Sequence, residues 1–313
     1  MGKKVDIVVV NWNAGEKSLH AITPYLECKS PFIECNVIVV DNASADDSVN
    51  ILKDQFIKLI QNKKNVGFGK ACNQAIDKSN ADYILLLNPD TISGIDVLEN
   101  LVQFLETNTD YGIVGPSQID QNKNLMRSCA RFPTFKTSLY DVVGLSKLFP
   151  KYFTPAPIMT DWDHLQSKDV DHVMGSYMLL RKSMLNQTGL LDEDYFTYFE
   201  DLDLSKRGSD AGFKTFYNNK YSIIHEAGGT GEKAESSRLY YSLSSRHTYW
   251  RKHFTKTSLF VLTFFSITVE PLLRIIDSVI NKNKTPVKKI RKAYYRYIEN
   301  IRRRDVVNEE IKE

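Results

Sequence analysis

The stretch Ile84-Leu-Leu-Leu-Asn-Pro-Asp-Thr91 decides the fold of this 313-residue chain. Its four apolar residues run directly into Asn, Pro and Asp, and a short apolar run bounded by a breaker predicts a strand buried on both faces. Because Pro89 has no N–H to give to a ladder, we expect the strand to end before it. Asn88 and Asp90 would then lie at the carboxyl end of a central strand, which is where open α/β sheets bind ligands.

Asn88 and Asp90 provide two oxygen ligands with one residue between them. Such ligands suit a hard cation, Mg²⁺ or Mn²⁺, which can bridge the phosphate oxygens of a substrate. The alternative is an ordinary strand-ending turn, because Asn, Pro and Asp are all common turn residues. The rest of the chain decides between the two interpretations.

The segments around this stretch alternate between strand-like and helix-like patterns. The expected strands are residues 5–10, 37–40, 58–61, 83–87, 113–114, 170–180, 214–217 and 222–224. The expected helices are residues 16–28, 44–56 with Ser44 as the opening residue, the segment after Gly69, 94–107, and a helix that carries Glu200 and ends near Gly212. This alternation predicts an α/β fold with a Rossmann-like, mostly parallel sheet and helices on both faces.

Composition excludes several classes of protein. Hydrophobic content of 42% and charged content of 25% are ordinary for a globular chain. The four cysteines form no C-x-x-C pair, so neither a zinc site nor a disulfide framework is predicted, and a reducing compartment fits this usage. The apolar run near the N-terminus is too short for a signal peptide. We therefore expect a cytoplasmic protein.

The C-terminal part has a different character. Residues 282–304 hold ten Lys or Arg and one acidic residue, a balance of +9 in a chain whose net charge is +3. The apolar run 258–269 meets Glu270-Pro271, which is too early to span a bilayer that needs about 20 residues. After Pro286 the pattern predicts a basic amphipathic helix with interfacial tyrosines. We expect residues 258–304 to contact an anionic membrane surface; the alternative is packing against the rest of the chain or an oligomer interface.

Polar residues end several of the expected strands. Asn11, Asp41, Asn65 and the pair Asn88 and Asp90 each follow a successive strand. Such a row could hold a nucleotide, with Asp41 accepting from a base N–H or a ribose hydroxyl. The alternative is a set of independent turns.

Asn65-Val-Gly67-Phe-Gly69 also permits a dinucleotide-binding interpretation, which would make the chain an NAD-dependent oxidoreductase. The motif lacks the third glycine because Cys72 stands there, and it follows the third expected strand rather than the first. Both departures disfavour this alternative.

Two further candidates lie later in the chain. Glu200 and Asp201 follow a run of aromatic residues, and a carboxylate against apolar surface has a raised proton affinity and can act as a general base. Acidic residues that open a helix are also routine caps. His225 follows an apolar strand and could be a metal or phosphate ligand, although a lone histidine is more often structural.

In their order and spacing, these motifs resemble family-2 glycosyltransferases of the GT-A fold, close to the bacterial rhamnosyltransferase-like branch. The resemblance covers about residues 4–231. The segments that carry it are Val8-Val-Val-Asn11-Trp-Asn13, Val39-Val-Asp41-Asn-Ala-Ser44, Asn65-Val-Gly67-Phe-Gly69 with Asn73, Leu85–Thr91, Gly112–Pro116, Gly189–Asp192, Tyr198–Leu204 and His225–Gly229.

The resemblance implies a nucleoside-diphosphate sugar donor, a divalent cation and inversion at the anomeric carbon. Asp41 matches the base-binding aspartate of the family, and Asn88-Pro-Asp90 takes the place of its D-x-D motif, with Asn instead of the first aspartate. Asp90, with Asn88, would then be a ligand of Mg²⁺ or Mn²⁺. Asp201, with Glu200 beside it, matches the catalytic base, and His225 matches a histidine that approaches the metal or the diphosphate.

The remaining implied donor-binding residues are Asn11, Asn13, Asn65, Gly67 and Asn73. We therefore expect a catalytic domain over residues 1–235, with a nucleotide-sugar half at about 1–115 and an acceptor half at about 116–235 that begins with a loop-rich insertion. Residues 236–313 would form a helical, basic-amphipathic extension.

The expected function is an inverting glycosyltransferase of cell-surface polysaccharide assembly, with rhamnose as the sugar that the branch suggests and a lipid-linked glycan as acceptor. It would act at the inner face of the cell membrane, and no nucleic acid is expected as a partner. Besides the oxidoreductase, the alternative is a non-catalytic scaffold or a nucleic-acid binder that uses the basic tail.

Overall fold

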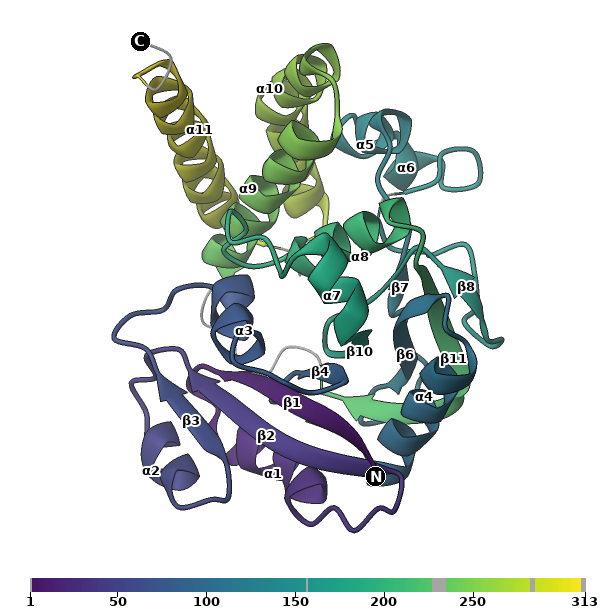
Figure 1. Cartoon of the computed structure of the whole chain (residues 1–313). Helices are drawn as coiled ribbons and strands as arrows, with labels where there is room; N and C mark the ends of the chain where they lie inside the picture. The colour runs from purple at the N-terminus through teal and green to yellow at the C-terminus, as the bar shows by residue number, and fades with distance from the viewer. Residues whose placement is uncertain (1, 156, 227–234, 282–284, 311–313) are drawn as a thin grey trace. The chain divides into compact units, whose positions relative to one another are not determined.

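The computed structural model describes residues 2–155, 157–226, 235–281 and 285–310 (Figure 1). The chain forms two compact units. The sheet unit consists of Met1–Phe132, Pro157–Phe196 and Glu200–Thr230, and the helical unit consists of Pro133–Ala156, Thr197–Phe199 and Gly231–Glu313. The sequence placed a single boundary near residue 235, whereas residues 133–156, expected as a loop-rich insertion, join the C-terminal helices.

The sheet unit is built on one mixed sheet of nine strands among the described residues. Its strands are β1 (Lys3–Asn11), β2 (Ile33–Asp41), β3 (Lys58–Gln61), β4 (Tyr83–Leu87), β5 (Thr91–Ile92), β6 (Tyr111–Ile119), β8 (Lys168–Val170), β10 (Tyr177–Arg181) and β11 (Lys214–His225). Their order is β3-β2-β1-β4-β10-β6-β11-β5, with β8 beside β11. A separate two-stranded sheet joins β7 (Cys129–Ala130) to β9 (His172–Val173).

The first four strands of this order run parallel, so their carboxyl ends share one edge. In the β1–β2 register, Asn11 lies opposite Asp41, and in the β1–β4 register, Val9 lies opposite Leu87. Strand β10 then pairs antiparallel with both β4 and β6, and β11 returns to a parallel pairing with β6. The predicted strand 83–87 is confirmed, and it ends one residue before Asn88.

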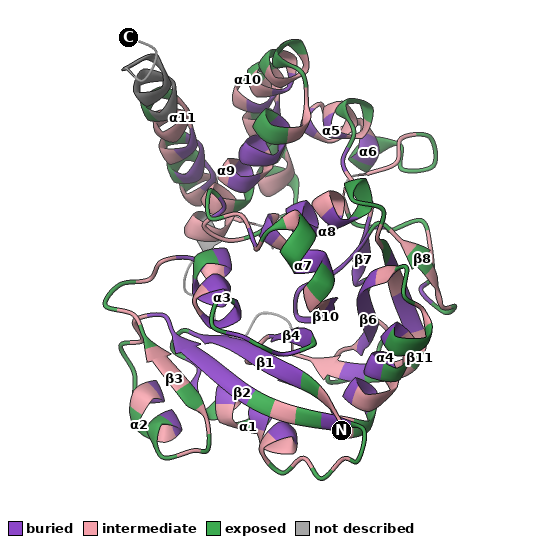
Figure 2. Cartoon of the chain, viewed as in Figure 1, coloured by how far each residue is buried: buried purple, intermediate pink, exposed green. Residues whose placement is uncertain are grey.

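Alternate residues of the central strands enter two different cores, and helices cover both faces as predicted. Val9, Val39 and Leu87 pack on one face with α1 (Gly15–Leu26) and α4 (Ile95–Thr107). On the other face, Val8, Val40 and Leu86 pack with other helices of the unit, α3 (Phe68–Ile76), α7 (Lys182–Thr188) and α8 (Glu200–Asp210). The short α2 (Ser48–Lys53) joins the first face. Figure 2 shows the resulting buried strands β1 and β4.

Three local expectations were wrong. The segment 170–180 is not one strand but β8, β9 and β10, because the chain turns at Gly175 and Ser176. The expected strands 214–217 and 222–224 are one strand, β11, whose pairing with β6 shifts register between Asn218 and Ser222. Ser44 does not open a helix: α2 begins at Ser48, and no side chain caps it.

The helical unit contains α5 (Phe135–Val142), α6 (Leu145–Leu148), α9 (Glu235–His253), α10 (Lys256–Ile280) and α11 (Val287–Glu310). Helix α10 contacts α5, α9 and α11, and α11 also lies along α9. The core of the unit contains Leu243 from α9 with Ile290, Tyr294 and Tyr297 from α11. The tyrosines of α11 that were expected at a membrane surface are therefore partly internal.

Helix α10 corrects the expectation that the apolar run stops at Glu270-Pro271. It continues through Pro271 to Ile280 and is 25 residues long. Within the described residues, it alone is long and apolar enough to cross a membrane, judged by length and composition, and 17% of its apolar window is buried. Phe260, Leu272 and Ile276 are 72%, 61% and 54% exposed. Part of the predicted basic run, residues 282–284, lies outside the described residues.

Candidate functional site

The ends of β1 and β2 are joined by a network of buried polar side chains. The Asn11 amide donates to Asp41 Oδ1 at 2.7 Å and to Ser44 Oγ at 3.0 Å. The Asn11 oxygen accepts from the Ser18 hydroxyl at 2.7 Å, and the Ser44 backbone N–H donates to Asp41 Oδ2 at 3.1 Å. Each Asp41 oxygen has taken one of these bonds and keeps lone-pair capacity for a ligand, in a fixed orientation.

Asn13 ties the next turn to this network. Its backbone is left-handed, with φ of 55°, and its side-chain oxygen accepts from the Ala45 N–H at 2.7 Å. Its own N–H donates to Ser44 Oγ at 2.9 Å. Ser44, which the sequence suggested as a helix cap, instead joins both strand ends.

The N-terminus of α3 is closed by protein rather than open to a phosphate. Asn65 Oδ1 accepts from the Gly67 N–H and from the Asn42 amide, both at 3.0 Å. Gly67 has a φ of 91°, and a Cβ there would lie 2.4 Å from the carbonyl oxygen of Phe196. That same carbonyl accepts from the Phe68 N–H at 2.8 Å. A dinucleotide diphosphate would need this place, so the NAD-dependent alternative is wrong.

Asn73 bonds to a loop of the protein with both ends of its amide. Its nitrogen donates to the Leu191 carbonyl at 2.7 Å and to Glu193 Oε1 at 3.2 Å, while its oxygen accepts from the Leu191 N–H at 3.1 Å. It therefore holds the segment before α8 and is not brought together with the strand ends.

Asp90 and His225 come together from different strands, as the resemblance implied. His225 Nε2, at the end of β11, lies 3.3 Å from Asp90 Oδ1. Burial alone would raise the pKa of the Asp90 carboxyl, but the hydrogen bond and charge of His225 outweigh it and hold that pKa below its ordinary value. Asn88, two residues before Asp90, is half-buried, and its N–H donates to the Ser176 carbonyl at 2.9 Å.

Gln118 of β6 orients His225, and sequence reasoning missed it. Its Oε1 lies 3.0 Å from His225 Nδ1, and its amide also bonds the Ser176 hydroxyl at 2.8 Å. Because a carbonyl oxygen accepts, the His225 Nδ1–H donates to Gln118, and Nε2 is the ring nitrogen that faces Asp90. Only the register between β6 and β11 brings these residues together.

The Asp90–His225 arrangement fits a divalent cation. Two adjacent ligands at about 2.1 Å from one Mg²⁺ in an octahedral site would be roughly 3 Å apart, close to the 3.3 Å between Asp90 Oδ1 and His225 Nε2. The described residues contain no cluster of three or more His, Cys, Asp or Glu that could hold a metal. The pair Asp90 and His225 still suits Mg²⁺, because this cation typically takes one or two carboxylates and fills its other positions with water and substrate phosphates.

Asp201, in the first turn of α8, is held by backbone N–H groups. Gly175 donates to its Oδ2 at 2.9 Å and Leu202 to its Oδ1 at 2.8 Å. A Cβ at Gly175 would lie 2.9 Å from the same Oδ2, so a glycine is required for this approach. The group that this glycine admits is the Asp201 carboxylate.

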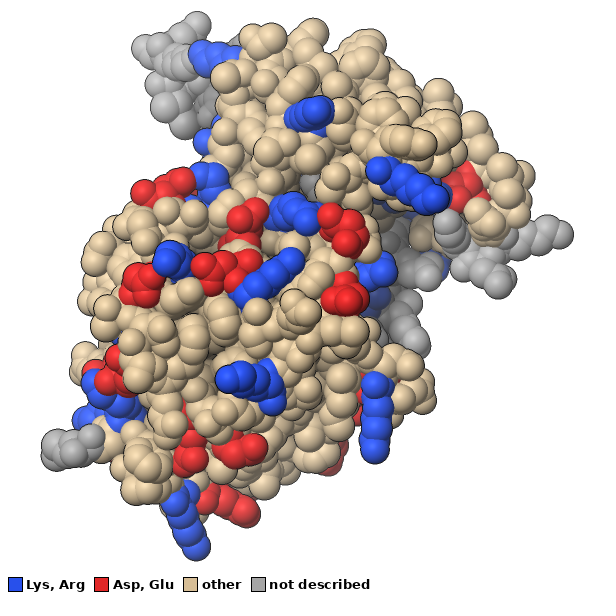
Figure 3. Space-filling view, turned by 90° about the vertical axis from the view of Figure 1, so that its right-hand side faces the viewer, with Lys and Arg blue, Asp and Glu red and all other residues tan. Residues whose placement is uncertain are grey.

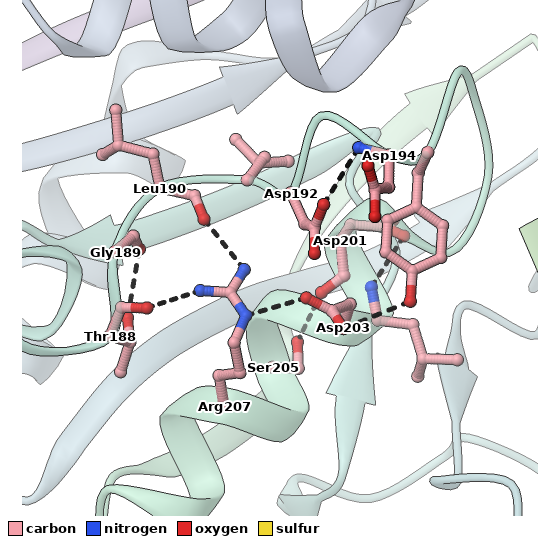
Figure 4. Close-up of polar contacts among 12 residues, drawn as sticks. Thr188, Gly189, Leu190, Asp192, Asp194, Asp201, Asp203, Ser205 and Arg207 are labelled. Atoms are coloured by element: carbon pink, nitrogen blue, oxygen red, sulfur yellow. Dashed lines mark hydrogen bonds and ion pairs between the residues drawn. The ribbon is translucent and has the colours of Figure 1, made fainter. Parts of the chain in front are cut away.

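Helix α8 is anchored by the pair Arg207 and Asp203 (Figure 4). Arg207 donates to Asp203 Oδ2 at 2.7 Å and to the carbonyls of Thr188 and Leu190 at 2.6 and 2.8 Å. The Tyr195 hydroxyl donates to the other Asp203 oxygen at 3.2 Å. Because these bonds tie the helix to the segment before it, the position of Asp201 is fixed.

His172 lies behind Asp201, and the sequence analysis did not single it out. It is buried, its Nε2 is 3.6 Å from Asp201 Oδ2, and its Nδ1 is 2.8 Å from the Ser205 hydroxyl. Burial lowers the pKa of His172, more than Asp201 and Asp171 raise it. In the sequence, the one feature that could have indicated His172 as a site residue is its position close to Gly175-Ser176.

Glu200 takes a different direction from Asp201. It is buried, and a Cβ at Gly69 of α3 would lie 3.5 Å from the Glu200 Cβ. Glu200 therefore faces α3, whereas Asp201 faces the Gly175 turn. Of the two predicted catalytic carboxylates, Asp201 is the one joined to the other candidate residues.

The alternative that the chain binds nucleic acid through basic residues is not supported by the face drawn in Figure 3. There, Lys and Arg lie beside Asp and Glu over the middle and lower parts of the view, and in its upper part they stand apart from one another rather than in a continuous stripe. Binding to a nucleic-acid backbone calls for clustered positive charge.

Comparisons with known proteins agree with this geometry. Residues 6–189 match glycosyl transferase family 2. An N-acetylglucosaminyl-diphospho-decaprenol L-rhamnosyltransferase of Mycobacterium tuberculosis (strain ATCC 25618 / H37Rv) is 25% identical over 236 residues, which are 69% of this chain and 76% of the relative. Rhamnosyltransferase WbbL of Escherichia coli (strain K12) is 29% identical over 171 residues, 54% of this chain and 61% of the relative.

A solved structure shares the fold. The mannosyltransferase PcManGT from Pyrobaculum calidifontis, in complex with GDP-Man and Mn²⁺, has a TM-score of 0.57 and 12% identity, covering 95% of this chain and 88% of that chain. The predicted GT-A fold with C-terminal helices is therefore confirmed. Because the family match spans more than half of its residues, this chain belongs to glycosyl transferase family 2 and is a glycosyltransferase.

Proposed function

We propose that this glycosyltransferase transfers a sugar from a nucleoside-diphosphate donor to a hydroxyl group of a glycan, with inversion at the anomeric carbon. The observation that carries the proposal is the double contact of Gly175-Ser176. The Gly175 N–H holds the Asp201 carboxylate, and the Ser176 carbonyl holds the N–H of Asn88. A candidate base and a candidate cation site are thus joined through one short segment, as a reaction between two positioned substrates requires.

On the donor side, Asp90, His225 and Asn88 would hold Mg²⁺ or Mn²⁺. When bound, the cation offsets the charge that grows on the departing nucleoside diphosphate. Asp41 would accept from the base or ribose of the nucleotide, and Asn11 keeps its carboxylate oriented. The complex of PcManGT with GDP-Man and Mn²⁺ supports this assignment.

On the acceptor side, Asp201 takes the proton of the attacking hydroxyl group. The acceptor oxygen forms its bond to the anomeric carbon from one face while the bond to the diphosphate breaks on the opposite face. Asp201 is left as a neutral acid and returns its proton to solvent. This sequence needs no covalent intermediate on the enzyme.

The names of the two relatives suggest a sugar and an acceptor. Both relatives are rhamnosyltransferases, and the mycobacterial one is named for a diphospho-decaprenol acceptor. We propose rhamnose as the donor sugar and a lipid-linked glycan as the acceptor, in cell-surface polysaccharide assembly at the inner face of the cell membrane. The exposed apolar residues of α10 and the basic residues of α11 support contact with an anionic membrane surface.

The test is a screen of nucleotide sugars for thermal stabilisation with Mg²⁺ or Mn²⁺ present. We expect one deoxysugar nucleotide to raise the melting temperature only when the cation is there. NMR of the product formed from that donor should show the inverted anomeric configuration. A product with retained configuration would remove Asp201 from the role of base, and stabilisation without any cation would remove the metal assignment.

A further inference from the structure

A groove runs between α10 and α11 within the helical unit. Its volume is about 520 Å³, which lies inside the range of roughly 300–1,000 Å³ typical of small-molecule sites. The residues that line it are Ile267, Pro271, Ile275, Ile290, Arg291, Lys292, Tyr294, Tyr295 and Ile298. Neither the activity nor the candidate site in the sheet unit uses this groove.

The floor of the groove is a continuous apolar surface. Ile267, Pro271 and Ile275 follow one another at four-residue spacing, which puts them on one side of α10. Ile290 and Ile298 supply the facing side from α11. Such a channel between two helices is suited to an extended hydrocarbon chain rather than to a polar ligand.

The rim of the groove carries positive charge. Arg291 and Lys292 are exposed, and no ion pair of either is found among the described residues. Two other arginines of the unit differ from them, because Arg246 and Arg274 both pair with Glu270. Two unneutralised cations beside an apolar channel complement a ligand with an apolar body and an anionic head.

A third feature lies in the wall of the groove. The Tyr294 side chain is buried and its hydroxyl interacts with Arg274, but no acceptor for the hydroxyl hydrogen is found within the described part of the chain. A buried hydroxyl whose hydrogen has no acceptor is unfavourable. An oxygen of a bound ligand would relieve this, and phosphate oxygens are strong acceptors.

We propose that the groove between α10 and α11 binds one hydrocarbon chain bearing a phosphate, with the chain on the isoleucines and the phosphate at Arg291, Lys292 and Tyr294. The inference rests in part on the proposed lipid-linked acceptor, whose carrier would be such a molecule. It makes the helical unit a binding site for a single lipid anion, in addition to a surface that touches a bilayer.

Two other occupants fit less well. A second copy of the chain, in a two-fold interface, would bring the same patch against itself, so Arg291 and Lys292 would face like charges. A bilayer would cover the convex apolar surface of α10, where Leu272 and Ile276 are exposed, more readily than a concave channel. Both remain outcomes that the experiment detects.

The experiment is calorimetric titration of the full chain with farnesyl phosphate, below its micelle concentration and without vesicles. Farnesol and inorganic phosphate are titrated separately. We expect farnesyl phosphate to bind at least about tenfold more tightly than either of its parts, because the apolar and ionic contributions act together. Equal affinity for farnesol and farnesyl phosphate would overturn the role of the cations.

Matched variants locate the site. Ile275→Ala removes a groove residue, while Ile276→Ala makes the same change on the exposed side of the same helix. We expect the first to weaken farnesyl phosphate binding by about tenfold and the second to leave it unchanged. If both variants lose binding equally, or neither does, the groove is not the site.

Charge reversal gives a test that does not disturb the core. The exposed pair Arg291→Glu and Lys292→Glu should abolish binding, and the exposed control pair Lys256→Glu and Lys288→Glu should keep it. Sedimentation of each variant reports the oligomeric state. A dimer that dissociates with the first pair, without any farnesyl phosphate binding in the parent chain, would identify a second copy as the occupant.

One more variant separates this proposal from the proposed function. Asp90→Ala lies in the sheet unit and should lose cation-dependent donor binding but keep farnesyl phosphate binding. Loss of both would mean that the phosphate binds at the donor site instead. If the chain binds farnesyl phosphate but transfers no sugar to any lipid acceptor, the groove is still a binding site, and the proposed acceptor is rejected.

Discussion

The two units of this chain place charged and apolar side chains in opposite ways. In the sheet unit, the apolar residues are buried between strands and helices, and the polar groups gather at one edge of the sheet. In the helical unit, Glu270 is buried between Arg246 and Arg274, while apolar residues of α10 such as Phe260 are exposed.

We expect the sheet unit to carry the transfer reaction and the helical unit to serve contact with a membrane or lipid. At the sheet edge, hydrogen bonds to neighbouring groups fix the directions of the side chains of Asn11, Asp41 and Asp201 and the position of Asn88. These bonds add little to the packing of the core. In the helical unit, the buried Glu270 holds α9 and α10 together, and α10 exposes apolar side chains. Changes at the sheet edge should therefore alter turnover, and changes in the buried cluster should alter stability.

The largest expected effect is on the chemical step. Asp201→Asn keeps the shape of the side chain but removes its ability to accept a proton, so the transfer rate should fall by about 10²–10⁴-fold. Donor affinity and melting temperature should change little, since the two backbone hydrogen bonds that the Asp201 carboxylate accepts from described residues are partly retained by an amide oxygen. Steady-state kinetics of purified protein decide this, and near-normal turnover would reject Asp201 as the base.

The next effect is on the helical unit. Glu270→Ala leaves Arg246 buried without its partner, and breaking a buried pair in this way typically destabilises by about 3–5 kcal/mol. Hydrogen exchange of α9, α10 and α11 should rise, while donor binding in the sheet unit holds. Glu299→Ala, on the half-exposed side of α11, is the control. If exchange in the sheet unit rises as much, the two units do not unfold separately.

Glu270 also predicts an acid transition in the helical unit. Burial would raise the pKa of its carboxyl, but Arg246 and Arg274 more than offset this and hold the pKa below the ordinary value of 4.5. A carboxyl whose folded pKa is depressed stabilises above its unfolded pKa and loses that contribution as the pH falls. The free energy of unfolding should therefore drop below about pH 4.5 in the native chain and show a weaker dependence in Glu270→Gln.

A smaller effect distinguishes the two cation ligands at the sheet edge. Asp90→Ala should weaken cation-dependent donor binding by more than about tenfold, and Asn88→Ala should weaken it less, because only Asp90 brings a full negative charge. Titration of Mn²⁺ against each variant in the presence of donor measures both. Equal losses would mean that the motif acts through its turn and not through its ligands.

The smallest expected effect comes from His172, which would act through Asp201. His172→Asn should lower kcat by up to about tenfold, by loosening the carboxylate, and leave the KM for the donor unchanged. His164 is also buried in the sheet unit but bonds to Trp162 and Cys129 instead. His164→Asn should lower the melting temperature without this selective change in kcat, and identical kinetic behaviour of the two variants would make His172 merely structural.

Much of the sheet unit could be predicted from the sequence. The strand at 83–87 is confirmed because a buried apolar run followed by Pro89 admits few other structures. Asn11 and Asp41 were expected near each other because parallel strands end at one edge, and their hydrogen bond follows from that geometry.

The residues that were missed depend on distant pairings. Gln118 meets His225 only through the register of β6 and β11, and His172 meets Asp201 only after the chain turns at Gly175. No local pattern encodes these contacts. The roles of the predicted site residues stay predictions until the variants are measured.

The C-terminal helices show a different limit. An amphipathic pattern says that one face of a helix is covered, but not by what. The apolar stripe of α11, which was expected at a membrane, includes Tyr294 and Tyr297 in the core of the helical unit. Helix α10 exposes its apolar residues instead, because its buried side is formed by Leu262, Ser266 and Glu270. Deleting α11 would therefore remove core residues, and charge reversal is the cleaner test of membrane contact.

The contacts of Gly175-Ser176 also constrain how the enzyme could be redesigned. Gly175 touches the Asp201 carboxylate, and Ser176 touches both Asn88 and Gln118. A library that varied this segment to admit a new acceptor would move the base and the cation ligands at the same time, so most of its members would be inactive for reasons unrelated to acceptor fit. Libraries aimed at a new specificity should keep residues 174–177 and 88–91 constant and vary positions whose side chains support neither group.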